Sequence, residues 1–156
     1  MLDIITICDS FENGNTYIVG NEQEVIVIDP ANKISSITSA IKSRKVLGVF
    51  LTHAHYDHFK TLDAFLKKYN VNLYIHKNGV NKLTDINSSC AFFFSVTSLN
   101  NVNSENKIYI KDSDVINLNN ITIKVITTPG HTNCSVVYQI EDSMFTGDTL
   151  FNDGVG

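Results

Sequence analysis

The sequence predicts a single domain of the α+β class, which combines strands and helices, and three observations lead to that class. The chain of 156 residues has 43% hydrophobic residues and a net charge of -4, which suits one domain with its own core. Short runs rich in Ile, Val and Tyr open and close the chain. Segments with helical periodicity lie between these runs. We therefore treat residues 1–156 as one domain.

The first third of the chain predicts hairpins followed by a βαβ unit. LDIITI (2–7), NTYIVG (15–20) and EVIVID (24–29) are separated by FENGN and GNEQ, which carry the turn residues of hairpins. These runs predict an antiparallel β-meander. ISSITSAIKS (34–43) has the apolar spacing of a helix, and KVLGVFLT (45–52) is a nearly continuous apolar strand.

The remainder predicts one more helix and a second run of strands. TLDAFLKKY (61–69) has one apolar face and leads into the strand NLYIH (72–76). Residues 77–106 predict helical or irregular cover, and Phe92, Phe93 and Phe94 either cap the core or line an apolar rim of a pocket. NKIYI, DVINLNN, ITIKVITT, CSVVYQIED and SMFTGD then predict further strands.

Composition excludes several classes of function. Lys and Arg are scattered without a basic block, which argues against a nucleic-acid partner. The three cysteines have no CxxC spacing, which favours a reducing compartment. The start lacks the features of a signal peptide, and no apolar run reaches the roughly 18 residues of a membrane span. We expect a cytoplasmic protein that acts on a small molecule away from membranes.

The stretch LTHAHYDHF, residues 51–59, places three histidines and an aspartate directly after a predicted buried strand. Because side chains alternate in an extended segment, His53 and His55 point the same way and can reach one ion. Asp57 and His58, past the bend, can reach a neighbouring ion. Imidazole and carboxylate groups suit divalent cations such as Zn²⁺, and a catalytic site needs about three protein ligands and one open position. More ligands must therefore come from elsewhere in the chain.

Two later segments offer such ligands. TTPGHTN places His131 after a strand, and MFTGDTLF places Asp148 after another. A carboxylate has two oxygens, so Asp148 can bridge two cations. Taken singly, a histidine at a strand end is more often a surface residue, and a Gly-Asp pair is more often a turn. Their combination with the histidine-rich loop favours a metal site.

These segments together resemble the metal-binding motifs of the metallo-β-lactamase superfamily. THAHYDH, PGHT and FTGDTLF occur in that order at predicted strand ends, and VIDP is similar to the first motif of the family. The resemblance covers almost the whole chain, and DTLFNDGVG is most similar to the glyoxalase II-like hydrolases. It implies an αββα sandwich of two mixed or antiparallel sheets flanked by helices.

The resemblance also implies a role for each ligand. His53, His55 and His131 would hold the first ion. Asp57 and His58 would hold the second, and Asp148 would bridge the two. Asp29 would steady the metal loop through hydrogen bonds. An ordinary strand-ending Asp before Pro is an equally good interpretation of Asp29.

The implied activity is hydrolysis with one or two Zn²⁺ ions, or with Fe or Mn in their place. A bound cation lowers the pKa of water from about 15.7 to about 7, so that hydroxide forms at neutral pH. Asp57 would orient this hydroxide for attack on a carbonyl. The resemblance suggests a thioester as substrate, with hydroxyacyl-glutathione as the leading candidate.

Alternatives stay open at this point. A mononuclear-iron persulfide dioxygenase has the same fold, and a metal-binding module without turnover would carry the same motifs. Cys134 lies three positions after His131 and either approaches the metals or, as we favour, is a small buried thiol.

The resemblance also raises an expectation about the end of the chain. In the family, further residues after the bridging Asp supply a helix, a strand and one last histidine for the second metal, whereas this sequence ends at FNDGVG. We expect a C-terminally truncated domain in which the second ion is held weakly. Uncovered apolar surface would then favour a homo-oligomer or pairing with a complementary fragment.

Overall fold

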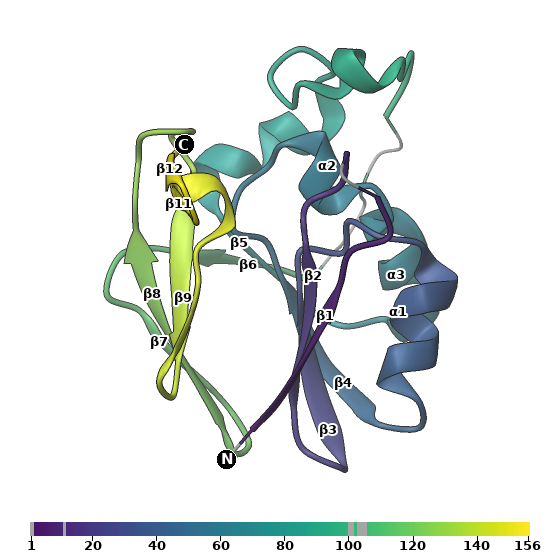
Figure 1. Ribbon diagram of the computed structural model, residues 1–156, viewed down its shortest axis with the longest axis vertical. Coiled ribbons are helices and arrows are strands. Elements are labelled where there is room, and N and C mark those ends of the chain that lie inside the picture. Colours follow the sequence, from purple (N-terminus) through teal and green to yellow (C-terminus); the bar gives the residue numbers. More distant parts are fainter. Residues whose placement is uncertain (1, 11, 100–101, 103–105) are drawn as a thin grey trace.

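The computed structural model describes residues 2–10, 12–99, 102 and 106–156, and its centre is a mixed sheet that we call sheet A (Figure 1). The strands of sheet A follow one another in chain order: β1 (Asp3–Ile7), β2 (Thr16–Gly20), β3 (Glu24–Ile28), β4 (Lys45–Phe50), β5 (Leu73–His76) and β6 (Lys107–Ile110). The first three strands are antiparallel, and β3, β4, β5 and β6 are parallel. The predicted meander and βαβ unit are confirmed.

A second, antiparallel sheet, which we call sheet B, packs against sheet A. Its strands lie in the order β10 (Ser143–Phe145), β9 (Val136–Ile140), β8 (Ile121–Thr127) and β7 (Val115–Leu118). A short hairpin of β11 (Leu150–Phe151) and β12 (Gly154–Val155) ends the chain. The segment NKIYI, expected to begin the second run of strands, instead pairs in parallel with β5 of sheet A. Parallel pairing requires a long crossover connection, and residues 77–106 supply it.

Helices cover the outer face of sheet A. They are α1 (Ile34–Ile41) and α3 (Leu62–Tyr69), with the short α2 (Tyr56–Phe59) above them in Figure 1. In the described part of residues 77–106, three 3₁₀ turns occur, as expected for helical or irregular cover: η1 (Lys77–Gly79), η2 (Asn81–Thr84) and η3 (Ala91–Phe94). A fourth 3₁₀ turn, η4 (Gly147–Thr149), follows β10.

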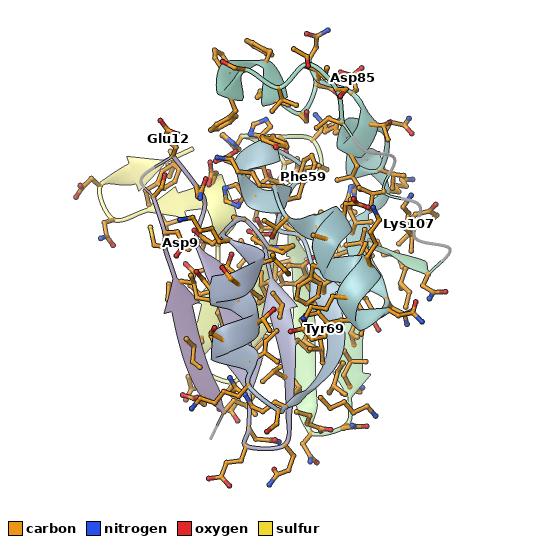
Figure 2. All side chains as sticks on the ribbon, turned by 90° about the vertical axis from the view of Figure 1, so that its right-hand side faces the viewer. Asp9, Glu12, Phe59, Tyr69, Asp85 and Lys107 are labelled. Carbon is orange, nitrogen blue, oxygen red and sulfur yellow. The ribbon has the colours of Figure 1, made fainter. Side chains whose placement is uncertain are left out.

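Two apolar cores hold these layers together. One lies between sheet A and its helices, where Ile37 and Ile41 of α1 and Phe65 of α3 are fully buried. The other lies between the two sheets, where Ile121 and Ile123 of β8 are buried while the alternating residues of that strand are exposed. Full burial of such a side chain contributes about 1.5–3 kcal/mol. In Figure 2, the helical side of the molecule faces the viewer, and Tyr69 marks the end of α3.

The layers agree with the fold class that the sequence predicts. Helices, a mixed sheet and an antiparallel sheet follow one another across the molecule, which are three of the four layers of an αββα sandwich. Within the described residues, no helix forms the fourth layer on the outer face of sheet B. Nor does any helix in those residues have the length and apolar character needed to cross a membrane.

The arrangement of the sheets brings three connections to one end of the molecule. β4 of sheet A ends at Phe50, β8 of sheet B ends at Thr127, and β10 ends at Phe145. Each strand runs toward the same end, so the segments that follow them meet there (Figure 1). Every histidine and aspartate that the sequence singles out as a metal ligand lies in one of these segments.

Candidate metal centre

The histidine-rich loop continues directly from β4 and turns into α2. Its first histidine, His53, is 2% exposed, and His58 within α2 is 3% exposed, whereas His55 and Asp57 are partly open to solvent. The extended backbone of His55 and the helical backbone from Tyr56 onward form the bend that the sequence predicts. Buried imidazoles need partners, so their contacts define the site.

A first cluster of donor atoms combines three histidines. One ring nitrogen from each of His53, His55 and His131 lies within 4.8 Å of the others. Nδ1 of His55 faces Nε2 of His131 at 2.9 Å, although the two residues are 76 positions apart in the sequence. Two facing ring nitrogens require either a proton or a cation between them. The three residues expected to hold the first metal therefore do come together.

A second cluster shares His53 with the first and adds His58 and Asp148. Nε2 of His58 lies 3.0 Å from Oδ1 of Asp148, and Nε2 of His131 lies 3.4 Å from Oδ2 of the same carboxylate. The two oxygens of Asp148 thus face one histidine from each cluster. This is the geometry that a bridging carboxylate needs.

Asp57 is the predicted ligand that the structure leaves outside both clusters. Its Oδ2 atom lies 3.6 Å from Nε2 of His58, and 26% of its side chain is exposed. Asp57, His58 and Asp148 line one cavity of about 650 Å³, which also contacts the C-terminal hairpin. Asp57 therefore lies at the cavity wall, where it can meet a bound molecule.

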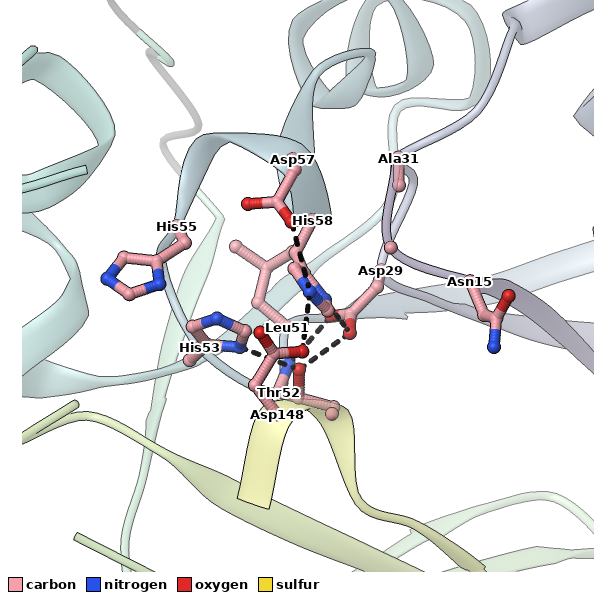
Figure 3. Close-up of polar contacts among 12 residues, drawn as sticks. Asn15, Asp29, Ala31, Leu51, Thr52, His53, His55, Asp57, His58 and Asp148 are labelled. Atoms are coloured by element: carbon pink, nitrogen blue, oxygen red, sulfur yellow. Dashed lines mark hydrogen bonds and ion pairs between the residues drawn. The ribbon is translucent and has the colours of Figure 1, made fainter. Parts of the chain in front are cut away.

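Asp29 organises the buried side of the site, as Figure 3 shows. Its carboxylate accepts hydrogen bonds from the backbone N–H of Thr52 at 2.8 Å, from Oγ1 of Thr52 at 2.6 Å and from Nδ1 of His58 at 2.8 Å. Asp29 is 1% exposed and has a left-handed backbone, with φ of 50°. The structure thus favours a positioning role for Asp29 over the alternative of an ordinary strand-ending aspartate.

These contacts also fix which nitrogen of each buried ring is free to bind a cation. An ionised carboxylate only accepts, so Nδ1 of His58 donates to Asp29 and Nε2 faces Asp148. The hydroxyl of Thr52 donates to Asp29, so its 3.2 Å contact with Nδ1 of His53 requires that nitrogen to donate. Nε2 of His53 then keeps its lone pair.

The charges of the site follow from burial and neighbours. Burial, followed by the adjacent histidines, lowers the pKa of His53 far below its usual range, so this ring is neutral. Burial also lowers the pKa of His55, with His131 adding to the effect. Burial alone would lower the pKa of His58, but the carboxylates of Asp29 and Asp148 outweigh it and raise that pKa to about 10.

Two glycines that the sequence assigns only to turns shape this site. A Cβ on Gly14 would lie 2.6–2.8 Å from the ring of His58. A Cβ on Gly147 would lie 2.4 Å from Oγ1 of Thr52, and Gly147 has φ of +49°. Neither these glycines nor Thr52 is singled out by the sequence reasoning. Their sequence signals are the FENGN turn for Gly14, the Gly-Asp pair for Gly147 and, for Thr52, its position just before His53.

A divalent cation fits this donor set. Nε2 of His53 is buried and, within the described residues, is the side-chain donor or acceptor atom left without a hydrogen-bond partner. Such an orphaned group costs about 1–3 kcal/mol. His53 belongs to both donor clusters, and neutral imidazole with carboxylate is the ligand chemistry of Zn²⁺ and related ions. Cys134 is buried against Oγ1 of Thr132 at 3.2 Å and belongs to neither cluster.

The two sheets face each other, and imidazole and carboxylate donors gather at one end of the interface between them. This arrangement defines a metal-binding α+β domain. The chain belongs to the metallo-beta-lactamase superfamily, whose family model matches residues 9–156. The expectation drawn from the motifs is therefore confirmed at the level of the family.

Individual relatives are more distant. The probable polyketide biosynthesis zinc-dependent hydrolase PksB of Bacillus subtilis is 29% identical over 136 residues, which cover 86% of this chain and 53% of that protein. A hydroxyacylglutathione hydrolase of Shewanella halifaxensis is 28% identical over 155 residues, which cover 97% of this chain and 53% of that protein. The chain thus spans about half the length of these curated relatives.

Solved structures share the fold. The crystal structure of the BLEG-1 B3 metallo-beta-lactamase superposes with a TM-score of 0.86 at 24% identity, over all of this chain and 76% of that one. At this identity, the likeness supports the αββα class and says nothing of the substrate.

Proposed function

We propose that the chain is a metal-dependent hydrolase that cleaves a carboxylic thioester. The observation that supports this proposal most directly is the buried, unpartnered Nε2 atom of His53, the residue that the two donor clusters share. Zn²⁺ bound there supplies Lewis-acid chemistry, because it lowers the pKa of water and polarises a carbonyl oxygen. The residues of the chain would hold the ions and orient the attacking water.

Each residue has a distinct task in this proposal. His53, His55 and His131 would hold one ion, while His58 and Asp148 would supply ligands for a second. Asp29 and Thr52 do not touch the ions but keep both buried rings in the orientation that points Nε2 inward.

Asp57 is the residue that we place beside the reacting atoms. Its partly exposed carboxylate lines the cavity next to His58 and Asp148, so it can accept a hydrogen bond from the attacking water. Through that bond Asp57 would orient the water toward the substrate carbonyl. A neutral amide at this position could not take up a proton.

The choice of a thioester rests on a relative. The Shewanella hydroxyacylglutathione hydrolase is similar over almost this whole chain, so hydroxyacyl-glutathione is the first substrate to test. The cavity of about 650 Å³ can admit part of a molecule of that size. We further expect the protein to act in the cytoplasm, where its three free cysteines would stay reduced.

A substrate screen tests the proposal. Zinc-loaded protein is assayed with thioesters, oxygen esters and lactams, alongside His53→Ala, Asp57→Ala and, as a matched control, His76→Ala. His76 ends β5 and belongs to neither donor cluster. We expect His53→Ala and Asp57→Ala to lose thioesterase activity by at least about a hundredfold, and His76→Ala to retain it.

The alternatives give different results in the same samples. If the parent and all three variants showed the same background rate of hydrolysis, the chain would be a metal-binding module without turnover. One tightly held iron, with oxygen consumption on a persulfide, would favour the dioxygenase. The second donor cluster of His53, His58 and Asp148 favours the two-ion hydrolase over that mononuclear alternative.

A further inference from the structure

A second cavity, of about 560 Å³, adjoins the candidate metal centre across α2. Tyr56 and Lys60 line this cavity, whereas Asp57 and His58 line the metal cavity. Lys60 caps α2 in a helical conformation, so Tyr56 and Lys60 are four positions apart on one helix face. Glu12, labelled in Figure 2, lines both cavities, which places them side by side.

Among the described residues, the hydrogen-bond acceptors of Lys60 are uncharged. Its Nζ donates to Oδ1 of Asn13 and approaches the carbonyl oxygen of Glu12 at 3.4 Å, and both acceptors are uncharged. None of the ion pairs among the described residues includes Lys60. A partly buried cation without a carboxylate partner attracts an anion.

Aromatic rings form the wall beside this cation. Nζ of Lys60 lies 4.1 Å from the centre of the Phe94 ring and 5.9 Å from that of Tyr56. The turn η3 that carries Phe94 is bracketed by Cys90 and Ser95, both with left-handed backbones. Such rings hold an ammonium group in place and offer apolar contact without neutralising it.

We propose that this cavity is a substrate subsite that binds a carboxylate joined to an apolar or aryl segment. The carboxylate pairs with Nζ of Lys60, and the apolar segment lies against Tyr56, Phe93 and Phe94, which line the cavity. The scissile bond then reaches the metal cavity past Glu12. This inference rests on the proposed function for the reaction, but the binding itself does not depend on turnover.

Ligand-observed NMR on the zinc-loaded protein tests the subsite. The probes are hydrocinnamate and its uncharged amide, which differ only in the carboxylate. We expect the parent chain to bind hydrocinnamate about tenfold more tightly than the amide, as one charge-assisted hydrogen bond provides. Lys60→Gln, which keeps a donor for Asn13, should remove that preference, and Lys60→Arg should retain it.

Lys68→Gln is the matched control, because Lys68 also lies near an aromatic ring, 6.0 Å from the centre of Tyr69, but lines neither of the two cavities. It should bind both probes as the parent does. A carboxylate preference that survives Lys60→Gln would place the anion on the metal and overturn the proposal. If Lys60→Gln fails to fold, Phe94→Leu takes its place and should weaken the binding of both probes. Unchanged binding in Phe94→Leu would also overturn the proposal.

The reaction is tested separately. Thioesters with and without a carboxylate are compared by kcat/KM in the parent and in Lys60→Gln. Turnover without any preference for the carboxylate would refute the subsite and leave the hydrolase standing. Binding preference without turnover would support the subsite and refute the proposed reaction.

Discussion

Oδ2 of Asp29 lies 2.8 Å from Nδ1 of His58, and both side chains are buried. The contact orients the imidazole so that Nε2 faces Asp148 at 3.0 Å. Asp29 belongs to the turn after β3 and His58 to α2, so one carboxylate connects the first βαβ unit to the donor atoms. Replacing either partner disturbs both the fold and the metal ligands.

Asp29→Asn should weaken metal binding about 10- to 100-fold, because an amide keeps only one of the two acceptor oxygens that serve Thr52 and His58 and lacks the charge that holds the His58 ring. It should also destabilise the metal-free protein, since breaking a buried ion pair costs about 3–5 kcal/mol. Zinc titration and urea unfolding measure the two effects. Asp9→Asn, at an exposed carboxylate that accepts from Lys33 and Ser36, is the control and should leave zinc affinity unchanged.

The metal-free protein should lose stability as the pH rises. Burial opposes the shift, but Asp29 and Asp148 raise the pKa of His58 from 6.5 to about 10. Because the pKa of His58 is raised in the folded state, the protonated ring stabilises the fold fully below pH 6.5. This contribution disappears as the pH rises through about 10. Urea unfolding of chelated protein across that range should show the decline, and His58→Gln should flatten it. A decline of equal size in both proteins would contradict this assignment.

Gly14→Ala should displace the ring of His58, because the new Cβ would lie 2.6–2.8 Å from three of its atoms. We expect a loss of about 1–3 kcal/mol in stability and a lower zinc content at the cluster of His58 and Asp148. The control is Gly154→Ala, whose added Cβ meets no atom within 4 Å. If the two variants retain equal zinc by elemental analysis, Gly14 has no special part in the site.

Removing the metal should lower the melting temperature. A cation that binds only the folded chain stabilises it by about 2.7 kcal/mol when present at a hundred times its dissociation constant. Chelation restores the unpartnered state of Nε2 of His53. Differential scanning calorimetry of loaded and chelated protein measures the change. Identical curves, in a sample shown to have held zinc, would refute a site within the folded domain.

Local patterns in the sequence predict most of the fold and the types of residue at the site. The alternation of apolar and polar residues in β8 and the apolar run of β4 are patterns among neighbouring residues. Such patterns can be recognised in the sequence itself. The histidine-rich loop can be recognised because four potential ligands, three histidines and one aspartate, lie within residues 53–58. The partner of β6 could not be predicted, because pairing across a long crossover is set by tertiary packing.

The residues that support the metal centre could not be predicted from the sequence, for the same reason. Gly14 and His58 are far apart in the sequence, and nothing near Gly14 indicates that an imidazole packs against it. The position of Asp57 outside the two donor clusters depends on the exact turn of α2, which residue spacing does not specify. Lys60 and Phe94 likewise meet only because η3 folds back over α2.

The donor atoms come from both sheets, and this division has a consequence for the order of folding. His53 and His58 follow β4 of sheet A, whereas His131 and Asp148 follow strands of sheet B. The complete set can form only after the two sheets have docked, which is a late step in a chain dominated by distant contacts. We therefore expect zinc to slow unfolding while leaving the refolding rate almost unchanged. Stopped-flow chevron plots with and without zinc would show this, and a matching increase in the refolding rate would place the ion in the folding nucleus instead.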